Sequence, residues 1–202
     1  MVPAEDLAGT MQRLHEEGKI LGYGLSEIGP YTLERCHAVH PVMAVQSEYS
    51  LWTRTPELGL IQRCASLGVA FAPFSPLARG AFGTPMADPA TFAPTEFRTR
   101  IPRFHAENWP HNKTRLDAFH AFARTRGFTP AALALAWLLD RGPHILPIPG
   151  TRTAEHLNAW AMAPEIDLDD HDREEIDRLL PIGWAWGDRY DDMQAATVER
   201  YS

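Results

Sequence analysis

The sequence predicts an α/β protein built from a repeated strand–helix unit. Four short apolar segments each end in a polar or glycine-bearing tip, and segments with a helical spacing of apolar residues lie between them. In such a repeat the strands run parallel, and the residues that carry chemistry collect at their carboxyl ends. A closed barrel of this kind needs eight strands, so four indicate half of one. The tips lie at residues 24–27, 45–49, 74–77 and 147–152.

The first half of the chain alternates expected helices with expected strands. Leu7, Met11 and Leu14 recur at helical spacing, and Gly18 is a natural stop for the helix that they define. Pro56 suits the first turn of a later helix, because the N–H that it lacks would have no helical partner there. The expected elements are helices over residues 4–17, 31–39 and 56–68 and strands over residues 20–25, 42–45 and 69–74.

The second half begins with a long irregular segment, residues 76–110, rich in Pro, Gly, Thr and Arg. Loops of this length in compact domains are usually functional or disordered. Two helices follow, and Thr129 before Pro130 is a good start for the second, because a threonine side chain caps free N–H groups. The remaining expected elements are that second helix over 131–140, a strand over 145–148, a short helix starting near 153 and a helix over 170–180.

Composition restricts the classes of partner. The formal net charge of −7 over 202 residues argues against nucleic acid and against an anionic membrane surface, which both need clustered Lys and Arg. No run of about 20 apolar residues is present, and the N-terminus lacks the basic and apolar regions of a secretory signal. Cys36 and Cys64 have neither metal nor redox spacing. We therefore expect one domain over residues 1–202, in the cytoplasm, with two reduced thiols.

A phosphate-binding turn is the most specific local signal. Gly150 lets backbone N–H groups approach an anion, and the helix start that follows adds free donors and a positive dipole end. Thr151 offers a hydroxyl and Arg152 a forked cation, which together suit a phosphate monoester. In barrels of this type a phosphate site is common in the loops after strands seven and eight. The alternative is an ordinary turn with a surface arginine.

The other three tips carry groups that suit a flat ligand with an amide. Ser26 and Gln46 could hydrogen-bond a carboxamide, and Phe74, with Ser75 beside it, could stack on a heterocycle. Each of these residues alone is explained by an ordinary strand end. Together, at the same end of successive parallel strands, they resemble the floor of a cofactor site.

With these motifs, the chain resembles the C-terminal part of an aldo-keto reductase over essentially its whole length. Five motifs occur in the family's order, which makes the resemblance specific. They are residues 24–27 (GLSE), 44–51 (AVQSEYSL), 73–80 (PFSPLARG), 97–98 with 102–104 (FR and PRF) and 147–152 (PIPGTR). The resemblance implies a TIM-type (β/α)8 barrel, of which this chain would supply strands five to eight, and hydride transfer from NADPH to aldehydes and ketones.

The resemblance also implies which residues bind NADP(H). Ser26 and Gln46 would hold the nicotinamide carboxamide, and Phe74 would stack on the nicotinamide ring. The pyrophosphate loop would include Ser75, Leu77 and Arg79, and the surroundings of the adenosine 2′-phosphate would include Gly150, Thr151, Arg152 and His156.

Three positions depart from the family pattern. Glu27 stands where the family often has Asn, and Ala159 with Trp160 stands where a Glu–Asn pair commonly contacts adenine. These departures bear on the strength of cofactor binding.

The resemblance assigns no catalytic residue to this chain. The family's Asp, Tyr, Lys and His group comes from the first four strands, which would precede Met1. A tyrosine serves as proton donor only where a neighbouring cation lowers its pKa, and the only lysines, Lys19 and Lys113, do not follow a predicted strand. Tyr49 does, and we interpret it, with Trp52, as lining of the substrate pocket.

The sequence predicts no metal site. His37 and His40 have a spacing that allows shared metal binding, but no third ligand is nearby in the sequence, so surface histidines are the better interpretation. The acidic cluster over residues 167–172 lacks the glycine and the closing Glu of a calcium loop, and it suits a helix N-terminus.

Two hypotheses of function follow. The chain is either the cofactor-binding half of an NADP(H)-dependent reductase, inactive by itself, or a non-catalytic nucleotide-binding or protein-interaction module derived from one. Four parallel strands alone would leave open edges and an exposed interior face, so we expect self-association or pairing with a separate N-terminal half-barrel. A third possibility is that the protein begins upstream of Met1.

Overall fold

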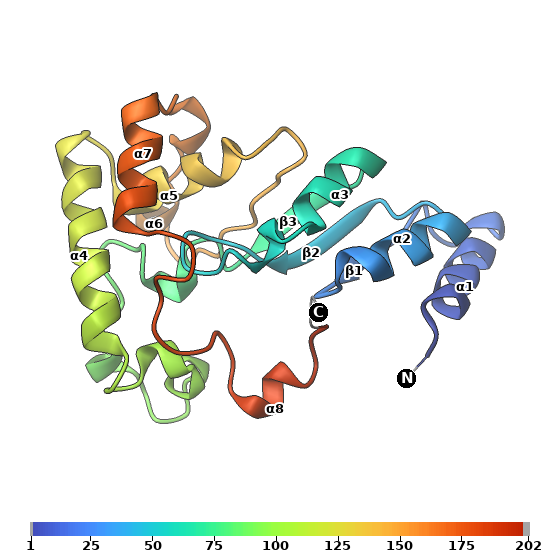
Figure 1. Cartoon of the computed structure of the whole chain (residues 1–202), viewed down its shortest axis with the longest axis horizontal. Coiled ribbons are helices and arrows are strands. Elements are labelled where there is room, and N and C mark those ends of the chain that lie inside the picture. The colour runs from blue at the N-terminus through green and yellow to red at the C-terminus, as the bar shows by residue number, and fades with distance from the viewer. Residues whose placement is uncertain (1, 200–202) are drawn as a thin grey trace.

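The computed structural model describes residues 2–199, in which a small parallel sheet lies between two groups of helices (Figure 1). α1 and α2 pack together at one end of the molecule, and α4, α5 and α7 pack at the other. The helices are α1 (Ala4–Glu16), α2 (Pro30–Val39), α3 (Leu60–Leu67), α4 (Trp109–Thr125), α5 (Pro130–Leu139), α6 (Ala154–Asn158), α7 (Asp170–Leu179) and α8 (Asp192–Ala195). The strands are β1 (Gly24–Ser26), β2 (Ala44–Glu48) and β3 (Ala70–Phe74).

The sheet is parallel, with its strands in chain order. This arrangement confirms the predicted strand–helix alternation in the first half of the chain, although β1 begins at Gly24 and not at residue 20. Val45 and Phe71 lie on one face of the sheet and are fully buried. The residues that alternate with them, including Gln46 and Ala72, lie on the opposite and more open face.

The sheet has three strands, so the prediction of four is wrong. Residues 145–148 run along β3 through two of its backbone hydrogen bonds, of 2.8 and 3.0 Å, but they form only an isolated bridge, between Phe71 and Ile145. Pro147 and Pro149 have no N–H to donate, so this segment remains an irregular edge of the sheet. A partial barrel in the strict sense, with four regular strands, is therefore not observed.

The predicted starts of two helices are confirmed. Thr129 caps α5, where its hydroxyl accepts the N–H of Ala132 at 3.0 Å. At α7, Asp169 and Asp172 form a capping box in which each side chain accepts the other residue's backbone N–H. The acidic cluster therefore serves this helix, and Arg126 pairs with both aspartates.

The long segment 76–110 folds onto the core. It contains four short 3-10 helices, η2 (Ala78–Gly80), η3 (Pro89–Thr91), η4 (Phe97–Arg100) and η5 (Pro102–Phe104). Ile101 and Phe104 are buried, and Arg98 Nη1 donates to the carbonyl oxygen of Arg79 at 3.1 Å. These contacts hold the later part of the segment against its own beginning, just after β3, and against the core.

The C-terminal segment 183–199 returns to the sheet. The indole of Trp184 donates to the carbonyl oxygen of Leu51 at 2.7 Å, and the N–H of Glu199 donates to the carbonyl oxygen of Glu27 at 3.0 Å. Glu199, the last residue described, consequently lies beside the end of β1, and Figure 1 shows the C-terminal segment running from α8 toward β1. The tail thus crosses the carboxyl ends of the strands, where the predicted site lies.

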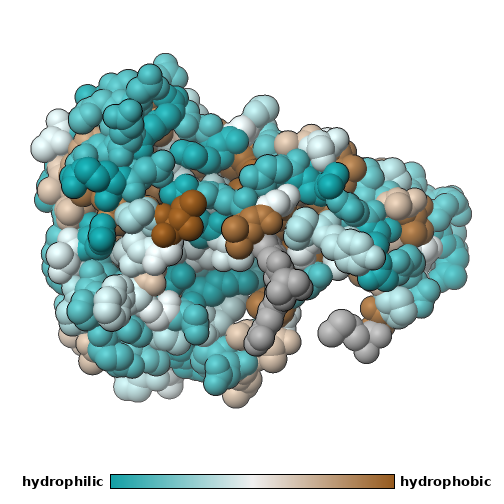
Figure 2. Space-filling view, in the orientation of Figure 1, coloured by the Kyte–Doolittle hydropathy of each residue, from teal (hydrophilic) through white to brown (hydrophobic). Residues whose placement is uncertain are grey.

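On the face seen in Figure 2, hydrophobic residues form small separate patches among hydrophilic ones. Within residues 2–199, none of the helices has the length and apolar character that crossing a bilayer requires.

Candidate functional site

Ser26 and Gln46 lie side by side at the carboxyl ends of β1 and β2. The register of the two strands pairs these residues directly, and the N–H of Glu27 donates to the carbonyl oxygen of Gln46 at 2.9 Å. Residues paired in a parallel sheet point to the same face. Both side chains are exposed, and neither makes a hydrogen bond within residues 2–199. A hydroxyl and an amide are therefore free beside each other on the open face of the sheet.

Phe74 lies at the end of β3 on the same face, opposite Glu48 in the register of β2 and β3. The chain then turns through strained conformations. Ser75, Ala78 and Arg79 have φ values of 48°, 50° and 55°, in the left-handed region that non-glycine residues rarely adopt. Strain of this kind collects at functional sites, because surrounding contacts must hold it in place.

Arg79 turns toward the strand ends. Its Nη2 donates to Oε2 of Glu48 at 2.7 Å, and its guanidinium lies 5.0 Å from the ring of Phe97 and 5.5 Å from that of Tyr190. Leu77, one turn earlier, is partly buried against the core. The pyrophosphate loop predicted from the sequence is thus anchored by an ion pair to β2.

The predicted phosphate turn is exposed. Thr151 Oγ1 donates to the carbonyl oxygen of Thr153. The hydroxyl of Thr153 caps α6, because it accepts the N–H of His156 at 3.2 Å. Arg152 forms no ion pair with any residue from 2 to 199. The pKa of Glu96 is lowered mainly by a hydrogen bond from Arg98 and to a smaller degree by the charge of Arg152.

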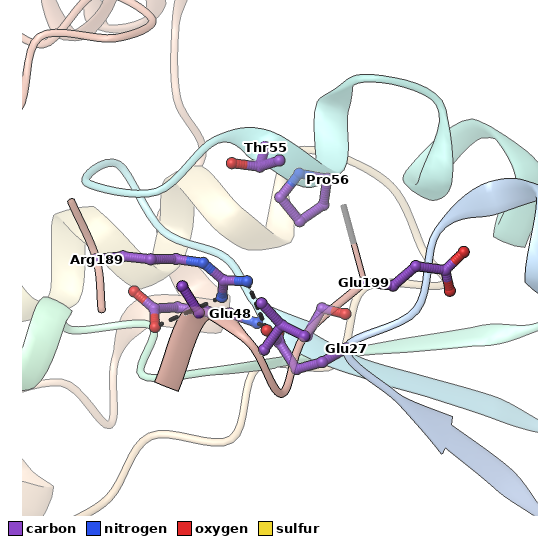
Figure 3. A pocket seen from close by; sticks show the side chains of 9 residues that line it. Glu27, Glu48, Thr55, Pro56, Arg189 and Glu199 are labelled. Carbon is purple, nitrogen blue, oxygen red and sulfur yellow. Dashed lines mark hydrogen bonds and ion pairs between the residues drawn. The ribbon is translucent and has the colours of Figure 1, made fainter. Parts of the chain in front are cut away.

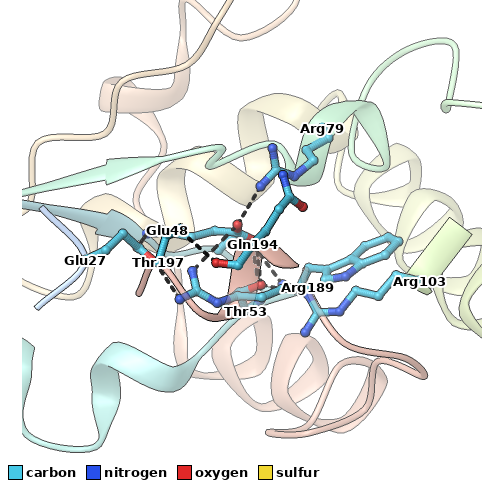
Figure 4. Close-up of polar contacts among 10 residues, drawn as sticks. Glu27, Glu48, Thr53, Arg79, Arg103, Arg189, Gln194 and Thr197 are labelled. Carbon is cyan, nitrogen blue, oxygen red and sulfur yellow. Dashed lines mark hydrogen bonds and ion pairs between the residues drawn. The ribbon is translucent and has the colours of Figure 1, made fainter. Parts of the chain in front are cut away.

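Charged residues from four parts of the chain meet between these groups, and we call Glu27, Glu48, Arg79 and Arg189 the strand-end ion cluster (Figure 4). Arg189 Nη2 lies 2.6 Å from Oε2 of Glu27, and Nη1 lies 3.8 Å from Oε2 of Glu48. Glu48 is 5% exposed, and these arginines are its charged partners. Its other oxygen accepts the hydroxyl of Thr53 at 2.9 Å.

Arg103 adds a further buried cation beside the cluster. It donates to the carbonyl oxygen of Gly187 and to Oγ1 of Thr53 at 2.7 Å, and it lies 5.5 Å from the ring of Trp52. Burial lowers the pKa of Arg103 to about 10, because a guanidinium removed from water loses hydration of its charge. The strand ends therefore hold three arginines close to Glu27 and Glu48, with the charge of Asp188 also acting on Arg103.

Sequence reasoning did not identify Glu48, Arg103 or Arg189 as site residues. Glu27 and Glu48 lie within the predicted strand tips, which is a signal that the sequence does contain. Arg189 is 162 positions from Glu27 in the chain, and nothing local in the sequence marks it.

A cavity of about 250 Å³ opens beside the cluster (Figure 3). β2, η1 (Thr55–Glu57) and the tail enclose it, and its lining residues are Glu27, Ser47, Glu48, Thr55, Pro56, Arg189, Ala195, Val198 and Glu199. The hydroxyl of Ser47 is buried and has no hydrogen-bond partner among residues 2–199.

Tyr49 and Trp52, which the sequence suggested as pocket lining, lie at different depths. Tyr49 is fully buried, donates to Oε1 of Glu57 at 2.8 Å and packs on Trp137. Burial, and then the charge of Glu57, raise the pKa of its hydroxyl. Trp52 is 6% exposed and lines a space beside Arg103 that is too small for more than a water molecule.

The described residues offer no activated proton donor at the open face. Lys19 and Lys113 are exposed and pair with Glu17 and Asp117. The pKa of Tyr190 is raised, because burial outweighs its neighbouring arginines. Within residues 2–199, no group of three or more His, Cys, Asp and Glu could hold a metal ion.

Comparisons with known proteins agree on one family. The model described as "Aldo/keto reductase family" matches residues 1–181. "Probable aldo-keto reductase 1" of Glycine max is 42% identical over 190 residues, which are 94% of this chain and 54% of the relative. The chain thus spans about half the length of the curated relative that it matches.

Solved structures are similar as well. The glycerol dehydrogenase of Gluconobacter oxydans superposes with a TM-score of 0.81 at 24% identity, over 95% of this chain and 57% of that one, and this similarity concerns the fold. An aldo/keto reductase from Klebsiella pneumoniae, solved with NADP and acetate, has a TM-score of 0.66 at 25% identity, over 94% of this chain and 58% of that one.

Proposed function

The chain belongs to the aldo/keto reductase family, and from this premise we propose that it forms the cofactor-binding part of an NADP(H)-dependent oxidoreductase. The reaction is hydride transfer between a nicotinamide and a small carbonyl compound or alcohol. The relative from Klebsiella pneumoniae, which holds NADP, supports the choice of cofactor. The complete reaction is part of the proposal, since this chain corresponds to about half of its relatives.

The observation that carries the proposal is the free pair of Ser26 and Gln46. The two residues are in register on the open face, and their side chains make no hydrogen bond within residues 2–199. A carboxamide needs both a donor and an acceptor, and this pair supplies both. Phe74 ends the next strand on the same face and offers a ring for the nicotinamide. These residues therefore fit the group that they are proposed to hold.

The phosphate end of the cofactor is assigned to the exposed turn at residues 150–152 together with His156. Arg152 forms no ion pair within residues 2–199, and Thr151 lies beside it. A 2′-phosphate would pair with this guanidinium and receive the threonine hydroxyl in place of the carbonyl oxygen of Thr153. Ser75, Leu77 and Arg79 are the proposed pyrophosphate loop, in agreement with the strained backbone there.

We propose that the chain alone binds the cofactor but does not reduce carbonyls. Carbonyl reduction needs an acid beside the hydride acceptor. The tyrosines near the strand ends, Tyr49 and Tyr190, both have raised pKa values, and the lysines are exposed on surface ion pairs. The second candidate function, a non-catalytic nucleotide-binding module, draws on this same observation.

The open face of the sheet supports a further part of the proposal, association with a second half-barrel. Leu146 and Ile148 are 54% and 46% exposed beside β3. Such a face is costly in water, and a copy of this chain or a separate N-terminal half could cover it. The free, buried thiols of Cys36 and Cys64 agree with the cytoplasm as the proposed location.

Titration with NADPH and with NADH tests the cofactor assignment. We expect NADPH to bind more tightly than NADH and the Arg152→Ala variant to lose that preference, because only NADPH carries the 2′-phosphate. Arg178→Ala is the matched control, since Arg178 is a surface arginine paired with Glu175. Equal affinity for both nucleotides in the unmodified chain would contradict the phosphate assignment.

An aldehyde assay with NADPH separates the two candidate functions from an active enzyme. The pure chain should show cofactor binding without turnover, and turnover by the chain alone would overturn the claim of inactivity. Activity that appears on adding a separate N-terminal half-barrel would favour the oxidoreductase over the binding module. Sedimentation then reports association, and a stable monomer at all concentrations would refute the pairing.

A further inference from the structure

Glu27 joins three segments at the end of the short strand β1. Its N–H donates to Gln46 O at 2.9 Å, and its own carbonyl oxygen accepts the N–H of Glu199 at 3.0 Å. Its side chain accepts the N–H of Glu48 at 2.8 Å and pairs with Arg189 at 2.6 Å. All four polar contacts are long-range, so this one residue connects β1, β2 and the tail.

The backbone of Glu27 is held in an unfavourable conformation. Its φ is 55°, in the left-handed region where a side chain with a Cβ is strained. Such a conformation persists only where surrounding contacts determine it. The backbone hydrogen bonds and the carboxylate contacts of Glu27 together are therefore the restraint, and Arg189 provides the charged part of it.

Arg189 sits between both strand ends. Its side chain is 21% exposed, while those of Glu27 and Glu48 are 12% and 5% exposed. Attraction between charges is stronger where water is largely excluded. The guanidinium of Arg189 thus links Glu27, next to Ser26, to Glu48, two positions after Gln46.

The short strands make this link important for the open face. β1 has three residues and pairs with β2 alone in the described sheet, so few ladder hydrogen bonds hold its carboxyl end. The direction of the Ser26 side chain depends on the backbone at Ser26 and Glu27. If Glu27 relaxes out of the left-handed region, the relative placement of Ser26 and Gln46 changes.

We propose that Arg189, acting through Glu27 and Glu48, is a positioning residue that holds Ser26 and Gln46 in the arrangement that binds the nicotinamide carboxamide. This rests on the proposed function, in which those two residues contact the nicotinamide. Arg189 touches neither the cofactor nor the reacting atoms in this role. The tail is thereby part of the nicotinamide end of the site and not of its adenosine end.

Calorimetric titration with two ligands tests this role in the full chain. NADPH carries both ends of the cofactor, whereas adenosine 2′,5′-bisphosphate carries the 2′-phosphate end without nicotinamide. Arg189→Gln and Glu27→Gln should each weaken NADPH binding about tenfold, which corresponds to ~1.4 kcal/mol. Binding of the bisphosphate should stay within about twofold in both variants. Arg189→Lys, which keeps the charge but not the fork, should recover part of the NADPH affinity.

The controls separate positioning from loss of fold. Arg178→Gln removes an exposed arginine that pairs with Glu175 outside the cluster, and both affinities should remain unchanged. Equal weakening of NADPH and bisphosphate in Arg189→Gln would overturn the proposal, because a general loss of structure acts on both ligands. Unchanged NADPH affinity in that variant would overturn it as well.

A ligand-free measurement distinguishes failure of this proposal from failure of the proposed function. If the unmodified chain binds neither ligand, the proposed function fails, and hydrogen exchange at the amides of Glu27 and Glu48 still reports the restraint. Exchange at these two amides should be faster in Arg189→Gln than in Arg178→Gln. Identical exchange in the two variants would refute the restraint independently of any cofactor.

Discussion

Replacing Glu48 by leucine removes the central carboxylate of the strand-end ion cluster. The side chain is 5% exposed and takes a hydrogen bond from Arg79 at 2.7 Å and one from Thr53 at 2.9 Å. Glu48→Leu leaves Arg79 without its ion-pair partner and Arg189 paired with Glu27 alone. We expect the free energy of unfolding to fall by about 3–5 kcal/mol, as for other buried ion pairs that lose one partner.

Urea unfolding, followed by tryptophan fluorescence, measures the effect. With a slope of ~2 kcal/mol per molar urea, the midpoint should fall by about 1.5–2.5 M. Glu48→Gln keeps one acceptor oxygen for Arg79, and its amide N–H can donate to the hydroxyl of Thr53, so it should lose less, about 1–2 kcal/mol. Glu175→Gln, at an exposed pair with Arg178, is the matched control and should change stability by less than about 1 kcal/mol.

The result that would refute this reasoning is a small loss. If Glu48→Leu costs no more than the exposed Glu175→Gln, the three arginines do not need the carboxylate, and water must reach the cluster. If Glu48→Gln costs as much as Glu48→Leu, the hydrogen-bond geometry is irrelevant and only the charge matters.

Three other changes have expected outcomes. Phe71→Ala opens a hole in the core, where Phe71 is 0% exposed, and should lower the free energy of unfolding in urea by about 3–5 kcal/mol; a loss below about 1 kcal/mol would contradict that packing. Thr129→Ala removes the cap of α5 and should lower the free energy of unfolding by about 0.5–2 kcal/mol in the same measurement. Thr125→Ala, at the C-terminal end of α4, should lower it less. Burial lowers the pKa of His120 below its ordinary 6.5. Its neutral form therefore contributes stability above about pH 6.5 that is lost as the pH falls through the folded-state pKa. Between pH 7.5 and pH 5.5, the free energy of unfolding should therefore decrease more in the unmodified chain than in His120→Gln. Equal decreases in the two proteins would exclude His120 as the source of the pH dependence of stability.

Local sequence patterns predicted the elements that depend on near neighbours. The helical spacing of Leu7, Met11 and Leu14 corresponds to α1, and the Thr129 cap lies where it was predicted, because both depend on residues within a few positions. The prediction of a fourth strand was wrong, and the reason is visible in the sequence. Pro147 and Pro149 lack the donors of a regular strand, and the apolar pattern alone outweighed them in the prediction.

The candidate site also contains residues that local sequence patterns predict and residues that they do not. Ser26, Gln46 and Phe74 could be found from the sequence, because each ends an apolar run and parallel strands bring such ends to one edge. Tyr49 also ends such a run, yet its side chain turns into the core toward Glu57. The direction of a side chain just beyond a strand depends on the turn that follows, which apolar periodicity does not describe.

The sequence by itself determined the strand–helix order, the polar strand tips and the family, because all three depend on short segments of adjacent residues. Only the tertiary structure decided that Arg189 lies between Glu27 and Glu48 and that the tail crosses the strand ends. Glu27 and Arg189 are 162 positions apart, and their contact exists because the intervening helices return the chain to the sheet. A charge pair over such a separation leaves no periodic trace, because its partners are chosen by the path of the chain and by burial.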